Sequence, residues 1–332
     1  MTTSNCTFVR NPLMVLAATA ALAIPVSANA QAEAFPSRPI VIVAPTAPGS
    51  NADLIARLVG ISLSKSMGVP VVVENKAGAA SAIGATAVAQ AKPDGYTLLL
   101  APTPVLATNQ WLYKKLTYNA EKDFAPIVAA ASTPNVLVVH PSVPAKNLAE
   151  LIALAKAKPN EITYASGGNG TSHHLCGELL KMNAAVSLTH VPYKSPAPAL
   201  QDVVAGRVSL MCENLSSALP HVRTGTLRAI ALTARQRHPM APEIATANES
   251  GLPDFEMGVW FGFVAPAGTP PAIIKRLNSE ITNALREPAA AQRMDSLGLT
   301  VLADSPESFG RFITAESAKW RKLVEVSGAQ VD

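Results

Sequence analysis

The sequence predicts an α/β protein in which short strands alternate with helices. Apolar runs of four to six residues recur along the chain, and segments with helical periodicity separate them. Hydrophobic residues make up 48% and charged residues 15% of the 332 residues, a composition typical of folded chains. This length suggests about two domains. Strand–helix alternation of this extent predicts mostly parallel sheets with helices on both faces.

The first thirty residues have the features of a cleavable export signal. Arg10 supplies a positive charge without a nearby acid, and residues 12–26 form an apolar segment. That segment is shorter than the about 20 residues that span a membrane. Ala28-Asn29-Ala30 has the small-residue pattern that precedes a signal-peptidase cut. We expect residues 1–30 to be removed and the mature chain to be exported, without a membrane anchor. A buried N-terminal helix is the alternative.

The predicted strands are short apolar runs bounded by turn-forming residues. They are 39–44, 70–74, 96–101, 127–131, 136–140, 162–165, 187–191, 207–211 and 227–233. The predicted helices are 51–67, 80–91, 147–157, 172–184, 197–205 and 216–224. In the first helix, the expected buried stripe is Leu54, Ile55, Leu58 and Ile61 or Ser62.

Two more helices are predicted near the C-terminus. Thr269 is expected to cap a helix that has Pro270 as its first residue. Its apolar stripe consists of Ile273, Ile274, Leu277, Ile281 and Leu285. The second helix begins at Ser305-Pro306 and carries Phe309, Phe312, Ile313, Trp320 and Leu323.

Two long extended runs predict where the chain passes between two lobes. Residues 127–140 form nearly one run, broken at 132–134, and residues 257–265 form another. Two such crossings predict one lobe from 35–133 with 257–332 and a second lobe from 134–256. A cleft between lobes is the usual place for a small ligand.

Charge and motifs exclude several classes of function. The net charge of +4 is dispersed, and no basic run alternates with aromatic residues, so we expect no nucleic-acid partner. The G-x-S-x-G and H-E-x-x-H motifs are absent. His173, His174 and Cys176 lie close together, but a zinc site needs about four ligands and no second cluster is evident. We therefore expect no metal, no cofactor and no enzymatic activity.

Three cysteines are present, and Cys6 is lost with the leader. Cys176 and Cys212 could form a disulfide in an oxidising compartment. A disulfide requires Cα atoms within about 7 Å, which spacing along the chain does not indicate. We favour two separate small buried residues.

Two loops that join a strand to a helix are candidate anion sites, because amides at a helix start lack intrahelical acceptors. For the first, spacing alone favours an ordinary turn with a capping side chain and an acid that complements the helix dipole. The second has three glycines within four residues, which costs chain entropy, and it fits a carboxylate site as well as a structural turn. The candidate residues are Pro48, Gly49, Ser50, Asn51 and Asp53 in the first loop and Gly168, Asn169, Gly170, Thr171, Ser172 and His173 in the second.

Two further loops carry polar groups at strand ends. Tyr193, Lys194 and Ser195 follow the strand at 187–191, and either of the first two could simply be solvated. Glu213 and Asn214 follow the strand at 207–211, where Glu213 either begins a helix or faces the cleft. Thr103, just after the strand at 96–101, completes the candidate set.

Nine short motifs in a fixed order resemble one family. They are FPSRPI at 35–40, P-x-x-P-G at 45–49, ENK-x-G at 74–78, PDGYTL at 93–98, KDFAP at 122–126, NGTS at 169–172, VPYK at 191–194, G-x-LRA at 225–229 and APAGTP at 265–270. Together they are similar to Bug-type solute receptors, the substrate-binding subunits of tripartite tricarboxylate transporters. The resemblance covers nearly all of the mature chain.

The resemblance implies a two-lobed type II periplasmic binding protein that holds a small organic acid in a cleft between lobes. The ligand would be a di- or tricarboxylate or an aromatic acid, held by loop N–H groups, hydroxyls and waters. The partners would be the membrane subunits of the transporter, and the receptor itself would be a monomer. A receptor that presents ligand to a sensor kinase and a periplasmic hydrolase are the alternatives.

Four positions depart from the family pattern. Ser50 and Ser195 replace glycines, Glu213 replaces an aspartate, and His173 stands where a small polar residue is common. Larger side chains there would narrow the pocket or change its polarity. His173 is either a group that sets ligand choice or a surface side chain beside the cleft.

Overall fold

The computed structural model describes residues 1–5, 7 and 35–330 and divides the chain into one unit of residues 1–34 and another of residues 35–332. The predicted leader therefore falls almost entirely outside the described residues, as does Cys6. Among the helices that are described, none has the length and hydrophobicity needed to cross a membrane.

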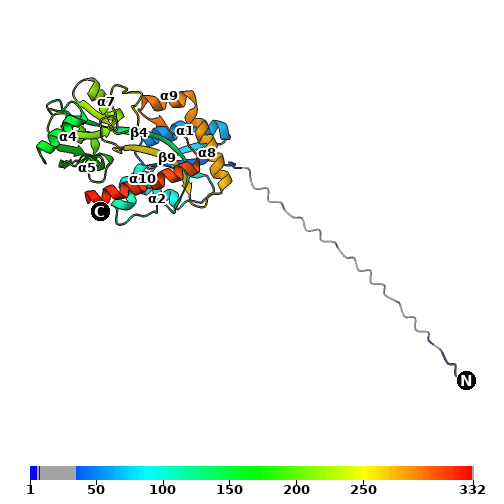
Figure 1. The fold of residues 1–332 in the computed structure, drawn as a ribbon. Coiled ribbons are helices and arrows are strands. Elements are labelled where there is room, and N and C mark those ends of the chain that lie inside the picture. The colour runs from blue at the N-terminus through cyan, green and yellow to red at the C-terminus, as the bar shows by residue number, and fades with distance from the viewer. Residues whose placement is uncertain (6, 8–34, 331–332) are drawn as a thin grey trace. The chain divides into compact units, whose positions relative to one another are not determined.

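The second unit is built on a mixed sheet with helices on both faces, which confirms the α/β class (Figure 1). The main path of the sheet runs β2-β1-β3-β9-β4-β7-β5-β6, and β8 and β10 pair with β4. The strands are β1 (Ile40–Ala44), β2 (Val71–Asn75), β3 (Thr97–Pro102), β4 (Phe124–Val139), β5 (Thr163–Ser166), β6 (Thr189–Pro192), β7 (Leu210–Asn214), β8 (Arg228–Leu232), β9 (Gly258–Pro266) and β10 (Thr300–Val301).

Most helices lie between successive strands where the sequence predicts them, whereas α3 and α9 were not predicted. The helices are α1 (Asn51–Met67), α2 (Ala82–Ala89), α3 (Asn109–Leu112), α4 (Leu148–Ala157), α5 (Ser172–Ala184), α6 (Pro196–Val204), α7 (Leu215–Arg223), α8 (Pro271–Arg286), α9 (Pro288–Ser296) and α10 (Pro306–Ser327). A 3-10 turn, η1 (Ala79–Ser81), and a π-helical turn, η2 (Pro104–Thr108), precede α2 and α3.

Strand β4 is shared by two halves of the sheet. Its residues Phe124–Pro134 pair with β9, whereas Asn135–Val139 pair with β7 on one side and Val136–Val139 pair with β8 on the other. The two strands predicted at 127–131 and 136–140 are therefore one, and the expected break at Pro134 is wrong. Pro134 lies opposite Gly258 in β9, where an added Cβ would come within 2.6 Å of the Thr133 carbonyl oxygen. Glycine at 258 thus lets the two strands approach closely at this crossing.

The strand directions bring two sets of carboxyl ends together at the middle of β4. Strand β3 runs parallel to β4, and its last residue, Pro102, pairs with Phe261, which in turn pairs with Ala131 of β4. Strand β7 runs antiparallel to β4 and ends with Asn214 opposite Asn135. Because β1 is parallel to β3, and β5 to β7, the carboxyl ends of β1 and β3 point toward the second half, and those of β5 and β7 point toward the first. Open α/β sheets bind ligands at such ends.

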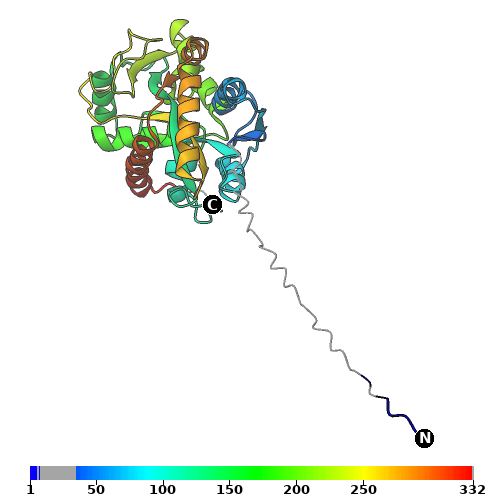
Figure 2. The same ribbon diagram turned by 90° about the vertical axis from the view of Figure 1, so that its right-hand side faces the viewer.

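Three hydrophobic clusters cover the sheet. Helices α1 and α8 pack on one face of the first half (Figure 2). Helices α6 and α7 pack on one face of the second half. The largest cluster continues across both halves on the other face, where α2, α10, α4 and α5 lie.

Three local predictions need correction. The buried stripe of α1 is Ala52, Ile55, Ala56, Val59 and Leu63, whereas Ile61 is 61% exposed. The cap of α8 is Pro270 rather than Thr269, whose hydroxyl instead donates to the Pro266 carbonyl. Strand β7 begins at Leu210, because Arg207–Ser209 belong to the preceding turn.

Candidate functional site

The loop between β1 and α1 is shaped by its own side chains. Ser50 is the N-cap of α1, and its hydroxyl accepts from the Asp53 backbone N–H. The buried Asp53 carboxylate accepts hydrogen bonds from Arg57 Nε at 3.1 Å, Gly49 N–H at 2.9 Å and Asn75 Nδ2 at 2.9 Å. The hydrogen bond from Arg57 is the main reason that the pKa of Asp53 falls to about 2. Asp53 therefore holds the loop in place, while Pro48 and Gly49 lie exposed at its tip.

The loop between β5 and α5 is tightly folded. Gly168 and Gly170 adopt φ values of 120° and 76°, a region that side-chain-bearing residues disfavour. Thr171 is the N-cap of α5, and its hydroxyl donates to the Gly168 carbonyl at 2.7 Å. The Gly170 N–H donates to His174 Nδ1 at 3.1 Å. Asn169 lies exposed at the tip, and Ser172 begins the helix.

Three stacked rings support this loop from below. The His174 and His190 rings stack with centroids 4.2 Å apart, and Tyr164 stacks on His190 at 4.7 Å. His190 Nε2 lies 2.7 Å from Ser166 Oγ, which accepts the Gly168 N–H. Burial is the main reason that the pKa of His174 is lowered and that of His190 falls to about 4. Both rings therefore hold the glycine loop in their neutral forms.

Glu178 and Lys181 are the charged groups that act on these rings. Tyr164 donates to the Glu178 carboxylate at 2.6 Å, and Lys181 Nζ lies 2.8 Å from it. Burial raises the pKa of Glu178, but the hydrogen bonds from Lys181 and Tyr164 outweigh burial and the pKa is lowered overall. His174 Nε2 is 4.0 Å from the same carboxylate.

We expect the protein to lose stability as the pH falls from 6.5 to about 4. An unfolded histidine takes up its proton near pH 6.5, whereas folded His190 resists protonation until about pH 4. The unfolded chain therefore binds more protons across this window, and acid favours it. Urea unfolding at several pH values measures the slope. His190→Asn should flatten it, and His221→Asn in α7 is the matched control. An equal slope in all three proteins would contradict the assignment.

In the loop after β6, the hydroxyl of Tyr193 is already engaged in a hydrogen bond. It donates to Asp202 at 2.6 Å, and burial with this bond raises the pKa of Tyr193 to about 12. Lys194 and Ser195 are exposed, and Ser195 is the N-cap of α6. Thr103 is buried at the end of β3, where its hydroxyl bridges the backbone N–H and carbonyl of Trp260 in β9.

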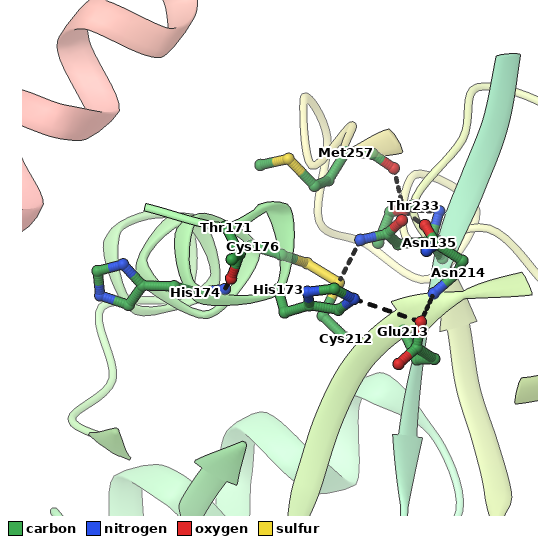
Figure 3. Close-up of a disulfide and its surroundings, with 10 residues drawn as sticks. All are labelled: Asn135, Thr171, His173, His174, Cys176, Cys212, Glu213, Asn214, Thr233 and Met257. Carbon is green, nitrogen blue, oxygen red and sulfur yellow. Dashed lines mark hydrogen bonds and ion pairs between the residues drawn. A yellow bond between two sulfur atoms is a disulfide. The ribbon is translucent and has the colours of Figure 1, made fainter. Parts of the chain in front are cut away.

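The end of β7 and the start of α5 are joined by a disulfide (Figure 3). Cys176 and Cys212 are bonded, with their Cα atoms 6.2 Å apart, so the expectation of two separate cysteines is wrong. One turn before Cys176 in α5, His173 points its Nε2 at Glu213 Oε1, 3.3 Å away. Glu213 Oε1 also accepts the Asn214 N–H at 2.7 Å. His173 is only 4% exposed, which excludes a surface side chain.

Two polar residues of β4 belong to the same region, although the sequence did not single them out. Asn135 pairs with Asn214 across the ladder, and its Nδ2 lies 3.7 Å from Cys212 Sγ. Thr133 is two residues earlier, on the same face of β4. In the sequence both residues looked like part of a break between strands. Polar residues inside an otherwise apolar run were the signal that could have identified them.

Thr233 anchors the backbone beside these residues. Its hydroxyl accepts the Asn135 N–H at 3.1 Å and also contacts the carbonyl of Met257. The Met257 N–H donates to the Thr233 carbonyl at 2.9 Å. The middle of β4, the end of β8 and the start of β9 are thus fastened together at one point.

The chain matches a family model described as the tripartite tricarboxylate transporter family receptor over residues 55–329. It is 39% identical over 293 residues to a UPF0065 protein from the tcbD-tcbE intergenic region of Pseudomonas sp. (strain P51), covering 88% of this chain and 87% of that one. It is 36% identical over 318 residues to Protein BugT of Bordetella pertussis, covering 96% of each.

Two solved structures with bound ligands are similar to it in sequence and in fold. R. palustris Rpa4515 with adipate is 34% identical with a TM-score of 0.76, covering 90% of this chain and 100% of that one. MatC (Rpa3494) from Rhodopseudomonas palustris with bound malate is 33% identical with a TM-score of 0.72, covering 87% and 100%.

Proposed function

Because this chain belongs to the tripartite tricarboxylate transporter receptor family, we propose that it captures a small organic carboxylate where its strand ends meet. It is a solute-binding receptor of a family whose solved members hold adipate and malate. The observation that carries the location is the opposed arrangement of β3 and β7, whose carboxyl ends both reach the middle of β4. The starts of α1 and α5 follow neighbouring strands with the same directions.

The ligand carboxylate would be held mainly by backbone N–H groups. Amides in the first turn of a helix lack intrahelical acceptors and favour anions. In α1, Ser50 uses the Asp53 N–H, which leaves the amides of Asn51 and Ala52 for a ligand. The proposed set of ligand-contacting or loop-forming residues is Pro48, Gly49, Ser50, Asn51, Asp53, Thr103, Gly168, Asn169, Gly170, Thr171, Ser172, His173, Tyr193, Lys194, Ser195, Glu213 and Asn214.

Within this set the contacts favour different roles. Asp53 and Tyr193 have their polar atoms engaged by Arg57 and Asp202 respectively, so they would shape loops. Thr103 is bound to Trp260 and would fix the end of β3. The exposed Lys194 remains available to a ligand carboxylate.

Two lobes that close on the ligand would follow from the shared strand. Residues 35–133 with 257–332 would form one lobe and residues 134–256 the other, joined near Pro134 and Met257. The pairing of β4 with different partners before and after this point supports the division. Two rigid lobes joined by two crossings can open and shut as a hinge.

The family is one of periplasmic receptors. We propose that this chain is exported to the periplasm and acts there as the receptor of a transporter. Residues 1–30 would direct export and be removed. The loaded, monomeric receptor would then deliver its ligand to the membrane subunits of a tripartite transporter. It would act by binding alone, without turnover of the ligand.

A thermal-shift panel of carboxylates tests this function. A ligand at 100 times its Kd adds about 2.7 kcal/mol to the free energy of unfolding, so at least one acid should raise the melting temperature clearly. The corresponding amide or methyl ester of that acid is the matched control and should have little effect. Small-angle scattering with the same acid should show a smaller radius of gyration. If no acid raises the melting temperature, the proposed function is wrong.

A further inference from the structure

Five residues at the middle of the sheet form a buried polar cluster: Thr133, Asn135, His173, Glu213 and Asn214. Thr133, Asn135, His173 and Glu213 are each at most 4% exposed. In the described part of the chain, five buried side-chain polar atoms lack a hydrogen-bond partner, and four of them belong to this cluster. They are Thr133 Oγ1, Asn135 Oδ1, His173 Nδ1 and Asn214 Oδ1.

These unpaired atoms lie on neighbouring positions of one surface. Asn135 and Asn214 are directly opposite each other in an antiparallel pair, so their side chains project from the same face of the sheet. Thr133 is on that face two residues away. The disulfide between Cys176 and Cys212 fixes α5 over the same face, and His173 stands one turn before it (Figure 3).

Leaving a buried polar atom unpaired costs free energy, and a fold normally avoids it. The fifth unpaired atom, Thr282 Oγ1, is isolated in α8. Four such atoms gathered at the point where the strand ends of both halves meet therefore indicate a place for a ligand's polar groups.

The chemistry of the cluster favours hydrogen-bond donors. The Asn135 and Asn214 side-chain oxygens can only accept. His173 Nε2 lies 3.3 Å from Glu213 Oε1, and Nδ1 of the same ring has no partner. Glu213 adds a buried carboxylate. A second ligand carboxylate placed here would meet acceptors and a negative charge, whereas an O–H or N–H group would be bound.

We propose that this cluster is a subsite for a hydroxyl or ammonium group on the carboxylate ligand. The receptor would thus prefer hydroxy or amino acids to plain acids of the same length. This inference rests on the proposed function. The helix-start loops would bind the carboxylate of the ligand, and the cluster would bind its hydroxyl or ammonium group.

Calorimetric titration with two matched series tests the subsite. One series is succinate, malate and aspartate, and the other is adipate with its 2-hydroxy and 2-amino derivatives. In at least one series the substituted acid should bind at least tenfold more tightly than the plain acid. Preference for the hydroxy acid assigns a hydroxyl, and preference for the amino acid assigns an ammonium group. In the second case Glu213→Gln should remove most of the preference.

Variants of the unpaired atoms separate recognition from general damage. Asn214→Leu or Asn135→Leu keeps a similar side-chain volume and should reduce the preference to within about twofold. Thr282→Val removes the isolated unpaired hydroxyl outside the cluster and should leave the preference as it was. Melting curves show which of the two asparagine variants is folded and suitable for titration.

The two ways of failing are distinct. If plain and substituted acids bind with affinities within twofold of each other, the subsite proposal is wrong, because water would then be the hydrogen-bond partner of the unpaired atoms. The proposed function would still stand. Failure of every carboxylate to bind, in these series and in the thermal-shift panel, would overturn the proposed function and the subsite with it.

Discussion

A Gly170→Val variant is expected to lose measurable binding of every carboxylate that stabilises the unmodified protein. Gly170 has φ of 76°, and a residue with a side chain pays roughly 1–2 kcal/mol in that region, more if it is β-branched. Valine would relieve this strain by turning the peptide, which withdraws the Gly170 N–H from His174 Nδ1. The amides at the start of α5 would then no longer present the arrangement that holds a carboxylate.

Gly225→Val is the matched control for this experiment. Gly225 has nearly the same φ, 74°, and no atom within 4 Å of an added Cβ, but it lies in the turn between α7 and β8. The backbone strain should lower the melting temperature of the Gly225→Val variant, which should still bind the acids with normal affinity. Calorimetric titration of both variants measures the difference. Normal affinity in a folded Gly170→Val protein would mean that this loop does not contact the ligand.

Replacing both Cys176 and Cys212 by alanine should lower the free energy of unfolding by about 4 kcal/mol, the chain-entropy value for a loop of 36 residues. A loss of this size corresponds to a melting temperature lower by roughly 10 °C. The two sulfurs are buried, so the alanines also leave a small gap between α5 and β7.

Reducing agent provides the control for the double variant. Dithiothreitol should bring the melting temperature of the unmodified protein close to that of the variant and should leave the variant itself unchanged. Equal melting temperatures for the oxidised protein and the variant would show that the bond contributes nothing to stability. Because His173 stands one turn from Cys176, the variant should also bind ligand more weakly.

Local signals predicted most helices, because residues next to each helix in the sequence mark where it begins and ends. The range of α1 is correct to the residue, since Ser50 caps it and Gly68 ends it in a left-handed conformation. The range of α5 is correct for the similar reason that Thr171 caps its start. Helix α9 was missed because only Glu287 separates it from α8, and no apolar stripe distinguishes it.

Features that depend on distant partners could not be predicted in the same way. A proline at 134 normally marks the end of a strand, but here Gly258, far along the chain, lets β9 lie close beside it. The disulfide joins residues that come together only when α5 packs over β7. Polar residues in the apolar run of β4 were a local signal for Thr133 and Asn135, but the sequence did not indicate that Asn214 lies opposite Asn135.

Strand β9 also determines when the first half of the sheet can form. It lies between β3 and β4, yet it is synthesised only after the whole second half, from β5 to β8. In a chain emerging from the ribosome, the edges of β3 and β4 that face β9 therefore lack their partner strand until residue 266 has been made. Pairings between such distant segments slow folding. The late arrival of one strand would keep the nascent protein from completing its fold early, and the second half would be the part able to acquire structure first.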